Sequence, residues 1–542
     1  MFLDIQKRAI CALAFSLLLP VSAFGQSTDR VSVDSNGAQA NNTSWSAAVS
    51  TEGRHVVFYS YASNLVTGDT NGMTDIFLKD TVTGVTERID VDVNGVQSDH
   101  NSWWPDITPD GRYVAYSSGA TNLVAGDTNW VIDVYRYDRQ TGITDMASVD
   151  SHGVGGDNHS FYPTISDDGQ RIAFMSKATN LVAGDTNGKQ DIFMHDFVSG
   201  STIRASVDST GFEANDDSNY PSISGNGYHI AYHSCASNLV RGDTNGAIDC
   251  FVYDAFGAGL TERVSTGGDD QQGNYHSSNP VISWDGRYVA FESGAHNWIP
   301  GDSVNTDIFV KDRWSSAISR VNISSTGTLG VEAFNCDMSA DGRYVTFWSN
   351  STFLIPNDTN NKEDVFVHDR DTGVTERVSV RSNGVEVPWA YCVYPAISPD
   401  GRCVAFRSDG YIVIDDTNNF DDIFLHDRWS GEGINSIYLT APSSATVGST
   451  IDLSWQCTRG GSNYWVAYSL NQGGQLFGGH IFDLGLPSYI LASGTHTLNG
   501  LGNYTTAPVP QAALGQTLHF EIAAQDAAGV LYDSNARSVV IN

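Results

Sequence analysis

One octapeptide decides the fold of this chain: Gly-Asp-Thr-Asn-Gly-Met-Thr-Asp, residues 68–75. It returns six more times with small changes. The first aspartate of the seven copies falls at Asp69, Asp127, Asp185, Asp243, Asp302, Asp358 and Asp416. Successive copies are 58, 58, 58, 59, 56 and 58 residues apart. A repeat at this spacing means that the chain consists of seven copies of one supersecondary unit, each of which packs on its neighbours.

Each unit holds four short stretches with a strand-like pattern and none with a helical period. In the last unit these stretches are residues 376–380, 394–398, 403–408 and 423–426. Four strands in each of seven units describe an all-β chain that forms a seven-bladed β-propeller. A sandwich of tandem hairpins is the alternative, but sandwiches do not repeat their sequence so faithfully.

Two further strings keep the same period. Residues 280–291 read Pro-Val-Ile-Ser-Trp-Asp-Gly-Arg-Tyr-Val-Ala-Phe, and residues 307–312 read Asp-Ile-Phe-Val-Lys-Asp. This pattern resembles the TolB-like propeller repeat, a PD-type relative of the WD repeat, over residues 28–431. The resemblance implies that the Pro-x-Ile-Ser strand is innermost (A). The Tyr-Val-Ala-Phe strand (B), the Asp-Ile-Phe strand (C) and the Thr-Glu-Arg strand (D) then follow outward.

The strand order predicts how the ring closes. The chain has a D-type strand at residues 29–34, before any A strand, whereas the last unit supplies A, B and C and no clear D. We therefore predict that the N-terminal strand completes the seventh blade, which removes the free sheet edge that an open ring would expose.

Three segments are predicted. Residues 1–25 are typical of an export signal, with two basic residues, an apolar run and small residues that suit cleavage before Gln26. Residues 26–431 form the propeller. Residues 432–542 lack the repeat, alternate as strands and resemble an immunoglobulin-like or fibronectin-like β-sandwich. No later stretch is apolar for long enough to span a membrane. We expect an exported monomer, periplasmic or secreted.

Cysteines are too few for a disulfide framework in a chain of this length. Cys235 ends strand B of the fourth unit, and Cys250 lies in strand C of the same unit. Because these strands are neighbours, the pair is a candidate disulfide.

The formal net charge of −33 excludes a class of partner. Nucleic acids require a basic surface, so we expect no nucleic-acid binding; cations, basic proteins and neutral ligands are favoured. The tight A–B and C–D turns carry acids accompanied by arginines, which we interpret as turn formers. The long B–C loops carry fourteen aspartates, and few bases lie within or beside the loops.

These B–C loops share the pattern Asp-x-Asn-Gly-x-x-Asp. Two carboxylates and an amide oxygen around a glycine turn are hard oxygen donors of the kind that Ca²⁺ prefers, so calcium is the predicted cofactor. The alternative is an Asx-turn that leads into strand C without a metal. The fifth copy is one residue shorter and is left out. The candidate ligands are Asp69, Asn71, Asp75, Asp127, Asn129, Asp133, Asp185, Asn187, Asp191, Asp243, Asn245, Asp249, Asp358, Asn360, Asp364, Asp416, Asn418 and Asp422.

Aromatic residues recur just before and at the start of strand A, where the D–A loops converge on the mouth of the channel. Such rings stack on sugars or grip a peptide, although packing between blades is the alternative. The ligand-face candidates are Trp103, Trp104, Phe161, Tyr162, Tyr220 and Tyr394.

Two sets of histidines are candidate metal ligands. His100, His159 and His276 lie in the D–A loops, but they are absent from the other blades, which argues against a catalytic metal centre. His195, His368 and His426 share one register with lysines and tyrosines of other blades, which we interpret as an exposed position.

The chain has no Gly-x-Ser-x-Gly elbow, His-Glu-x-x-His pair or phosphate loop. Repeated, nearly identical loops make repeated sites, whereas a catalytic centre breaks symmetry. We therefore expect a non-enzymatic binding protein with a protein or glycan on the long-loop face. The alternatives are an extracellular polysaccharide lyase or hydrolase that uses this face as its cleft, and a pure scaffold.

Overall fold

The computed structural model describes residues 26–429, with gaps at residue 258 and residues 302–304. Beyond residue 429 it describes only the backbone of the strands that lie within residues 437–541. The predicted export signal, residues 1–25, lies outside the described residues.

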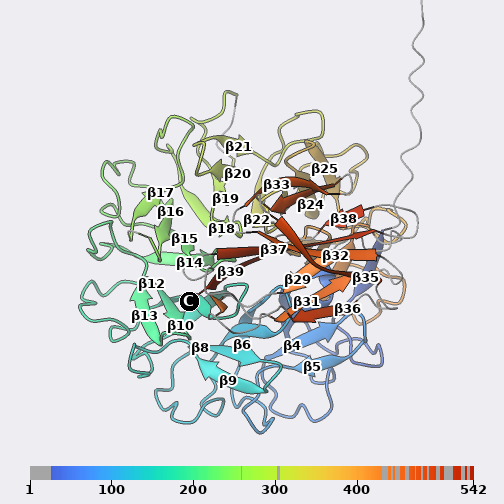
Figure 1. Cartoon of the computed structure of the whole chain (residues 1–542), viewed down its shortest axis with the longest axis horizontal. Helices are drawn as coiled ribbons and strands as arrows, with labels where there is room; N and C mark the ends of the chain where they lie inside the picture. Colours follow the sequence, from blue (N-terminus) through green and yellow to red (C-terminus); the bar gives the residue numbers. More distant parts are fainter. Residues whose placement is uncertain are drawn as a thin grey trace, which may run out of the picture.

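Seven four-stranded antiparallel sheets are arranged around a central axis (Figure 1). The strands of each blade follow one another from the axis outward, in the order A, B, C and D. The A strands are β2 (Ser44–Val49), β6 (Ser102–Ile107), β10 (Ser160–Ile165), β14 (Ser218–Ile223), β18 (Ser277–Ile282), β22 (Ala333–Met338) and β26 (Cys392–Ile397). The B strands are β3 (His55–Ser60), β7 (Tyr113–Ser118), β11 (Arg171–Ser176), β15 (His229–Ser234), β19 (Tyr288–Ser293), β23 (Tyr344–Ser349) and β27 (Cys403–Ser408).

The outer half of each blade is built in the same way. The C strands are β4 (Asp75–Asp80), β8 (Asp133–Asp138), β12 (Asp191–Asp196), β16 (Asp249–Asp254), β20 (Asp307–Asp312), β24 (Asp364–Asp369) and β28 (Asp422–Asp427). The D strands are β5 (Thr86–Arg88), β9 (Ile143–Met146), β13 (Ser201–Arg204), β17 (Thr261–Arg263), β21 (Ile318–Arg320), β25 (Val374–Arg377) and β1 (Ser27–Arg30). The predicted seven-bladed all-β propeller is thus confirmed.

The ring closes through the N-terminal strand. β1 pairs antiparallel with β28, from Ser27 opposite Asp427 to Arg30 opposite Phe424. β1 therefore supplies the outermost strand of blade 7, as the strand order predicts, and both ends of the propeller are held in one sheet.

The core lies in the B and C strands, which are buried on both faces because each blade is covered by two neighbours. Their sequences are accordingly apolar runs rather than alternating ones. One aromatic pair spans strands B and C in every blade, for example Phe58–Phe77 with ring centroids 6.1 Å apart and Phe406–Phe424 at 6.0 Å. All four rings are fully buried, and each contributes about 2–3 kcal/mol of hydrophobic stabilisation.

The tight A–B turns hold the blades at close contact. In blade 2, Asp110 Oδ1 accepts the backbone N–H of Arg112 at 2.9 Å, and Gly111 adopts φ +71°. A Cβ on Gly111 would lie 2.1 Å from His55 Nδ1 of blade 1, so only glycine fits. Arg112 makes a two-point ion pair with Asp138, with bonds of 3.0 and 2.8 Å. In this blade Asp110 is thus a turn former and Asp138 is paired with arginine, as expected.

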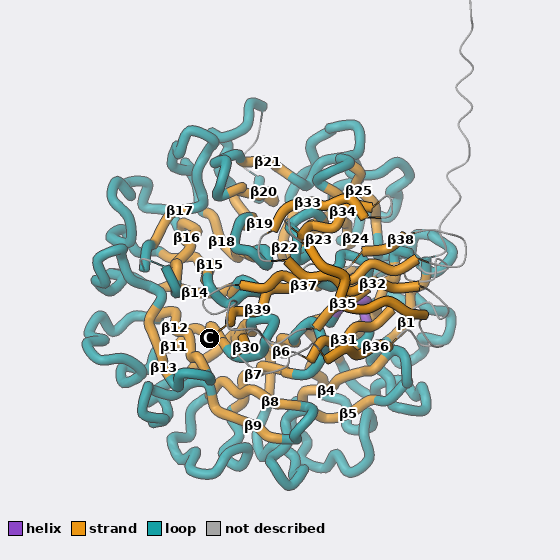
Figure 2. The backbone as a smooth tube through the Cα atoms, in the orientation of Figure 1, coloured by secondary structure: helices purple, strands orange, loops and turns teal. Residues whose placement is uncertain are grey.

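The single helical element among the described residues is a 3-10 turn, η1 (Thr51–Gly53). No helix in the described part of the chain is long and apolar enough to cross a membrane. Figure 2 shows the strands of each blade side by side, from the centre outward, with many loops gathered at the rim.

Strands also fill residues 437–541. They are β29 (Ile437–Thr440), β30 (Ser444–Ala445), β31 (Asp452–Cys457), β32 (Asn463–Ser469), β33 (Gln472–Phe477), β34 (His480–Leu484), β35 (Ser488–Thr495), β36 (Leu501–Thr505), β37 (Thr517–Gln525), β38 (Leu531–Asp533) and β39 (Arg537–Ile541). They form a three-stranded sheet, a larger sheet centred on β37 and β32, and a hairpin. The elements described in this segment are all strands, while its immunoglobulin-like or fibronectin-like character stays a prediction.

Candidate functional site

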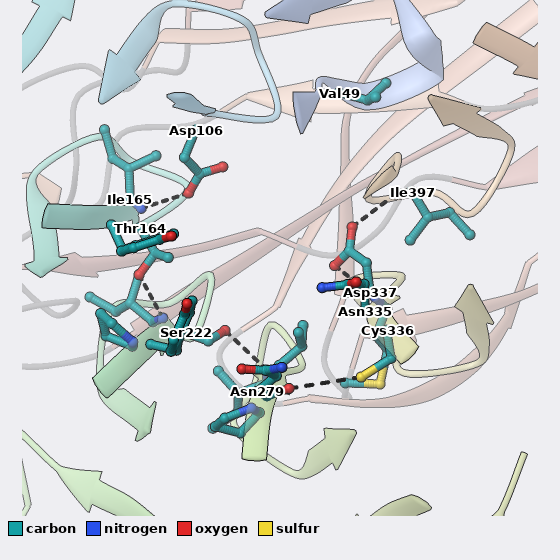
Figure 3. A pocket seen from close by; sticks show the side chains of 18 of the residues that line it. Val49, Asp106, Thr164, Ile165, Ser222, Asn279, Asn335, Cys336, Asp337 and Ile397 are labelled. Carbon is teal, nitrogen blue, oxygen red and sulfur yellow. Dashed lines mark hydrogen bonds between the residues drawn. The ribbon is translucent and has the colours of Figure 1, made fainter. Parts of the chain in front are cut away.

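The A strands enclose a central cavity of about 700 Å³ (Figure 3). The third residue of every A strand lines the cavity and has a left-handed backbone, with φ between 40° and 55°. These seven residues, the channel ring, are Ser46, Trp104, Tyr162, Tyr220, Asn279, Asn335 and Tyr394. The strand register shifts at this position in all seven A–B pairs, so a β-bulge re-aims each side chain toward the axis.

Neighbouring blades stabilise this backbone conformation. The N–H of Asn279 donates to His233 Nδ1 of the preceding blade at 3.1 Å. The N–H of Asn335 donates to Glu292 Oε1 at 2.7 Å, and Glu292 also accepts from the Asn279 side chain at 3.0 Å. Burial lowers the pKa of His233 to about 4, so its ring is neutral and accepts at Nδ1. Burial also raises the pKa of Glu292.

Three members of the channel ring form an aromatic arc, which consists of Trp104, Tyr162 and Tyr220. Trp104 and Tyr162 stack with ring centroids 4.2 Å apart, and Tyr162 and Tyr220 lie 4.7 Å apart. Burial and its hydrogen bond with Tyr220 raise the pKa of Tyr162, so the Tyr162 phenol is neutral at physiological pH. Tyr220 remains 41% exposed. The arc is therefore a continuous apolar wall on one side of the channel.

The predicted aromatic residues divide into two groups. Trp104, Tyr162, Tyr220 and Tyr394 line the cavity. Trp103 and Phe161 are the second residues of their A strands, β6 and β10. The ring of each packs against the ring of Trp104, with centroids 5.8 Å apart. They support the wall and do not line the cavity. The ring members Ser46, Asn279 and Asn335 were missed, although most ring residues precede a proline and share one register.

The opposite side of the ring is polar. Asn279 and Asn335 present amides, and Asn335 Oδ1 accepts the indole N–H of Trp348 at 2.8 Å. The indole therefore fixes the orientation of the Asn335 amide and leaves its N–H₂ group as a donor toward the cavity.

A second ring lies two residues further along the A strands. Asp106 Oδ2 accepts the N–H of Ile165 in the next blade at 2.9 Å, and Asp337 Oδ2 accepts that of Ile397 at 2.8 Å (Figure 3). Thr164 and Ser222 use their hydroxyls for the same contact in their blades. Burial raises the pKa of Asp106 to about 7 and that of Asp337 to about 6. Because neutral hydroxyls fill equivalent positions, this ring connects blades.

A smaller cavity of about 340 Å³ lies between blades 6 and 7 and shares Tyr394 with the channel. Its walls carry an exposed tyrosine, Tyr391, together with Asp409 and Arg407. The guanidinium of Arg407 lies 3.4 Å from the ring centroid of Trp45, which closes one wall. The cavity combines aromatic faces with charged hydrogen-bonding groups.

The B–C loops bring their two aspartates together, but around an arginine. The last residue of the D strand places its guanidinium between both carboxylates. In blade 1, Arg88 Nη1 lies 3.3 Å from Asp69 Oδ1 and 3.3 Å from Asp75 Oδ2. In blade 4, Arg263 is 3.4 Å from both Asp243 and Asp249. One arginine per loop therefore compensates part of the charge of the two aspartates, which corrects the interpretation that few bases lie beside these loops.

The same arrangement recurs around the propeller. Arg204 contacts Asp185 and Asp191, Arg377 contacts Asp358 and Asp364, and Arg30 contacts Asp416 and Asp422. Arg320 contacts Asp307 in blade 5. The antiparallel C–D pairing explains this: the end of strand D lies beside the start of strand C, for example Arg88 opposite Phe77.

The asparagine of each loop works as a turn former. Asn71 Oδ1 accepts the backbone N–H of Met73 at 2.9 Å, and its Nδ2 donates to Asp75 Oδ1 at 2.8 Å. The equivalent asparagines, Asn129, Asn187, Asn245, Asn360 and Asn418, make the same pair of bonds. Thus the amide nitrogen faces the carboxylate, and the amide oxygen is engaged within its own loop.

These donor sets do not fit Ca²⁺ while an arginine occupies them, since a cation and a guanidinium would compete for the same oxygens. The three carboxylates of Asp358, Asp364 and Glu386 lie within 4.8 Å of one another, yet Arg377 Nη1 contacts all three. Burial and the neighbouring Asp364 raise the pKa of Asp358 to about 6. The predicted calcium binding itself stays a prediction.

Blade 2 departs from this pattern. Its D strand ends in Met146, so no guanidinium reaches Asp127 and Asp133. The hydroxyl of Tyr135 donates to Asp127 Oδ2 at 2.5 Å, while Asp127 Oδ1 is buried without a hydrogen-bond partner among the described residues.

The register histidines are buried, contrary to the expectation of an exposed position. His195 and His426 are 5% and 1% exposed, and each bonds a D-strand threonine, Thr202 at 2.9 Å and Thr28 at 2.8 Å. His368 does the same with Thr375. The C–D hairpin of each blade is covered by the preceding blade, which encloses this position. Burial lowers the pKa of His426 and His368 to about 4.

The loop histidines also have structural roles. His159 Nδ1 accepts the N–H of Ile132 and His276 Nδ1 that of Ile248, both at 2.9 Å. Cys235 and Cys250 are free cysteines, so the predicted disulfide is absent from the structure. Cys250 lies opposite His233 in the B–C register and is buried, whereas Cys235 follows the end of β15 and is exposed.

Neither a known protein family nor a curated protein matches the sequence. Among solved structures, TolB from Agrobacterium tumefaciens is 18% identical with a TM-score of 0.33, over 54% of this chain and 83% of its own. A puromycin-hydrolysing peptidase from Mycobacterium tuberculosis is 12% identical with a TM-score of 0.43, over 80% and 61%. The extracellular domain of a hybrid two-component system from B. thetaiotaomicron is 11% identical with a TM-score of 0.36, over 95% and 59%. The assignment of the fold rests on the strand topology of the chain itself.

Proposed function

We propose that the protein is an exported binding protein that takes a glycan at the mouth of its central channel. The observation that carries this proposal is the asymmetric channel ring. Its aromatic arc of Trp104, Tyr162 and Tyr220 faces a polar side with Asn279 and Asn335. Sugar rings have apolar faces that stack on aromatic side chains and hydroxyls that need amide and carboxylate partners.

The adjoining cavity between blades 6 and 7 supports a ligand longer than one sugar. Tyr394 borders both cavities, and Tyr391 and Asp409 extend the wall beyond it. A chain that enters the channel mouth and continues over this cavity would meet aromatic faces and charged hydrogen-bonding groups in turn. A protein ligand, the other class expected on this face, would leave the oligosaccharide screen below without a hit.

Two channel carboxyls have a raised pKa and bear on the enzymatic alternative. Asp106 and Asp337 each accept two backbone N–H groups, one from their own strand and one from the next blade. Their oxygens are engaged in holding the ring together, so binding is the function that we propose.

The test is a screen of neutral and acidic oligosaccharides against the mature protein, followed by calorimetry on any that bind. Trp104→Ala should weaken binding by at least ~10-fold, as expected for the loss of one stacking platform. Trp314→Ala is the matched control, because Trp314 is 68% exposed in a C–D turn on the opposite face and should leave binding unchanged. Binding that survives Trp104→Ala, or that falls equally in both variants, would reject the channel as the site.

A further inference from the structure

Blade 2 contains a slot where the other blades hold their own arginine. A cavity of about 600 Å³ lies there, between the outer strands of blades 2 and 3. Its lining includes Asp127, Asn129, Met146 and Gly155 from blade 2, and His195 from blade 3. This cavity is separate from the central channel. A ligand that binds in it would not depend on the glycan binding proposed for the channel.

Two replacements in blade 2 open this slot. The arginine that ends strand D elsewhere is Met146. An isolated β-bridge closes each D–A loop. Its second residue is Gln97, Glu213 or Glu386 in three other blades and Gly155 in blade 2. In blade 6, for example, Glu386 Oε1 lies 2.7 Å from Arg377 Nη1. Blade 2 therefore lacks both the guanidinium and the side chain that covers it.

The acidic half of the site is nevertheless kept. Asn129 donates to Asp133 Oδ2 at 3.0 Å and Ser148 donates to Asp133 Oδ1 at 2.6 Å, as their equivalents do in blades 3 and 4. In those two blades the same Oδ2 also contacts the arginine, at 3.5 and 3.4 Å.

One buried oxygen in the slot has neither a hydrogen bond nor a guanidinium beside it among the described residues, whereas its equivalents on Asp358 and Asp416 lack a hydrogen bond but have a guanidinium nearby. Asp127 Oδ1 is buried with no hydrogen-bond partner among the described residues. The corresponding Oδ1 atoms of the first aspartates contact a guanidinium in five other blades, at 3.0 to 3.5 Å. Leaving such a carboxylate oxygen unpaired is costly, and a planar cationic donor relieves that cost.

The geometry points to the blade 2 slot as a binding site for an external guanidinium group, the arginine side chain of a peptide or protein. The chain itself supplies the template, because six D strands place an arginine in this position. Val149, Val154 and Met146 line the same cavity and would cover the alkyl part of such a side chain. The net charge of −33 favours the approach of a basic partner.

The experiment uses calorimetry on the mature protein with three probes: N-acetyl-arginine amide, its lysine analogue and its neutral citrulline analogue. The arginine probe should bind with one site per chain and more tightly than the other two. Met146→Arg should fold, since it restores the arrangement of the other blades, and should weaken binding of the arginine probe at least ~10-fold by filling the slot. Asp127→Asn should weaken it as well.

A gain-of-site variant provides the matched control. Arg263→Met combined with Gln272→Gly copies the blade 2 arrangement into blade 4 and should raise the stoichiometry from one to two. A Met146→Arg variant that folds, as judged by its melting curve, and still binds the arginine probe would overturn the proposal. So would equal binding of the citrulline analogue, or a wild-type protein that binds Ca²⁺ and ignores the arginine probe.

Discussion

The arginine clusters make a quantitative prediction about stability, which is sharpest in blade 6. Arg377 Nη1 lies 3.5 Å from Asp358, 3.2 Å from Asp364 and 2.7 Å from Glu386. The Arg377 side chain is 6% exposed, and both aspartate side chains are 2% exposed. Replacing Arg377 with methionine, the residue that blade 2 uses, removes the cation and leaves three carboxylates in one small volume.

Breaking a buried ion pair by removal of one partner costs about 3–5 kcal/mol. Protonation relieves part of this cost, because the pKa of Asp358, already raised to about 6 by burial and by Asp364, will rise further without the arginine. We therefore expect Arg377→Met to lower the free energy of unfolding by about 3 kcal/mol at pH 7.5. The folded state then binds protons that the unfolded state has lost, so the deficit should shrink as the pH falls toward 5.

Differential scanning calorimetry measures this loss. An unfolding entropy of ~2.1 cal/mol/K per residue over a propeller of roughly 400 residues converts 3 kcal/mol into a Tm lower by about 3–4 °C. Arg241→Met is the control, since Arg241 is an exposed arginine in a B–C loop of the same face. If Arg377→Met melts with Arg241→Met, the guanidinium does not hold the cluster together.

The same variant separates the two interpretations of the loops. With Arg377 absent, the three carboxylates have the spacing of a cation site, and millimolar Ca²⁺ should raise the Tm of the variant. The wild-type blade should not respond, because its arginine occupies the site. An equal rise in both proteins would show that calcium binds without displacing the arginine, and would refute the reasoning.

Three further predictions concern the rings, the turns and the cysteines. The difference in Tm between Asp106→Asn and the wild type should become more positive as the pH rises from 5 to 8. The reason is that burial raises the pKa of the Asp106 carboxyl to about 7, so below that pH the folded state keeps a proton that the unfolded state has lost. The wild type therefore loses stability as the pH rises through this range, and the Asp106→Asn variant does not; a pH-independent difference would contradict this. Gly111→Ala should lower the Tm by several degrees, because the new Cβ would clash with His55. Gly95 has a similar φ and nothing within 4 Å of a Cβ built on it, so Gly95→Ala should lower the free energy of unfolding by about 1 kcal/mol or less. Equal losses of stability in the two variants would refute the clash. Mass spectrometry after brief alkylation of the native protein should find Cys235 modified and Cys250 protected; the opposite pattern would place the two thiols wrongly.

The propeller was predictable because its information is repeated seven times. The 58-residue period and the four strand patterns predicted the blade count, which the seven four-stranded sheets confirm. The early D-type strand predicted the closure through β1, which the β1–β28 pairing confirms. The A–B turns were predictable for the same reason, since Asp110 and Gly111 carry their turn chemistry in the local sequence.

Side chains that meet across strands were harder to predict. Along the sequence the loops look nearly free of bases, because in five blades the arginine lies about 19 residues after the first aspartate, at the end of strand D, and in blade 7 it is Arg30 at the N-terminal end of the propeller. Antiparallel pairing of strands C and D brings that end back to the start of strand C, which a count along the chain overlooks. The channel ring was only partly found, since a β-bulge, and not simple alternation, decides which side chains face the axis.

Because the molecule contains seven copies of one unit, each blade can be compared with the other six. Features that recur around the ring, such as the left-handed ring residue of every blade and the loop asparagine of six blades, are explained by the architecture alone. Features that break the repeat need another reason. Aromatic residues occupy one part of the channel ring and amides another part. Blade 2 has Met146 in place of the arginine, and Gly155 in place of the side chain that covers that arginine in other blades. Without an arginine beside them, the paired aspartates destabilise the fold, because a buried carboxylate without a counter-charge costs free energy. Asp127 and Asp133 remain in place, with Asn129 and Ser148 still holding Asp133. A cation supplied from outside the chain accounts for that retention, and the departures from symmetry therefore locate both proposed sites.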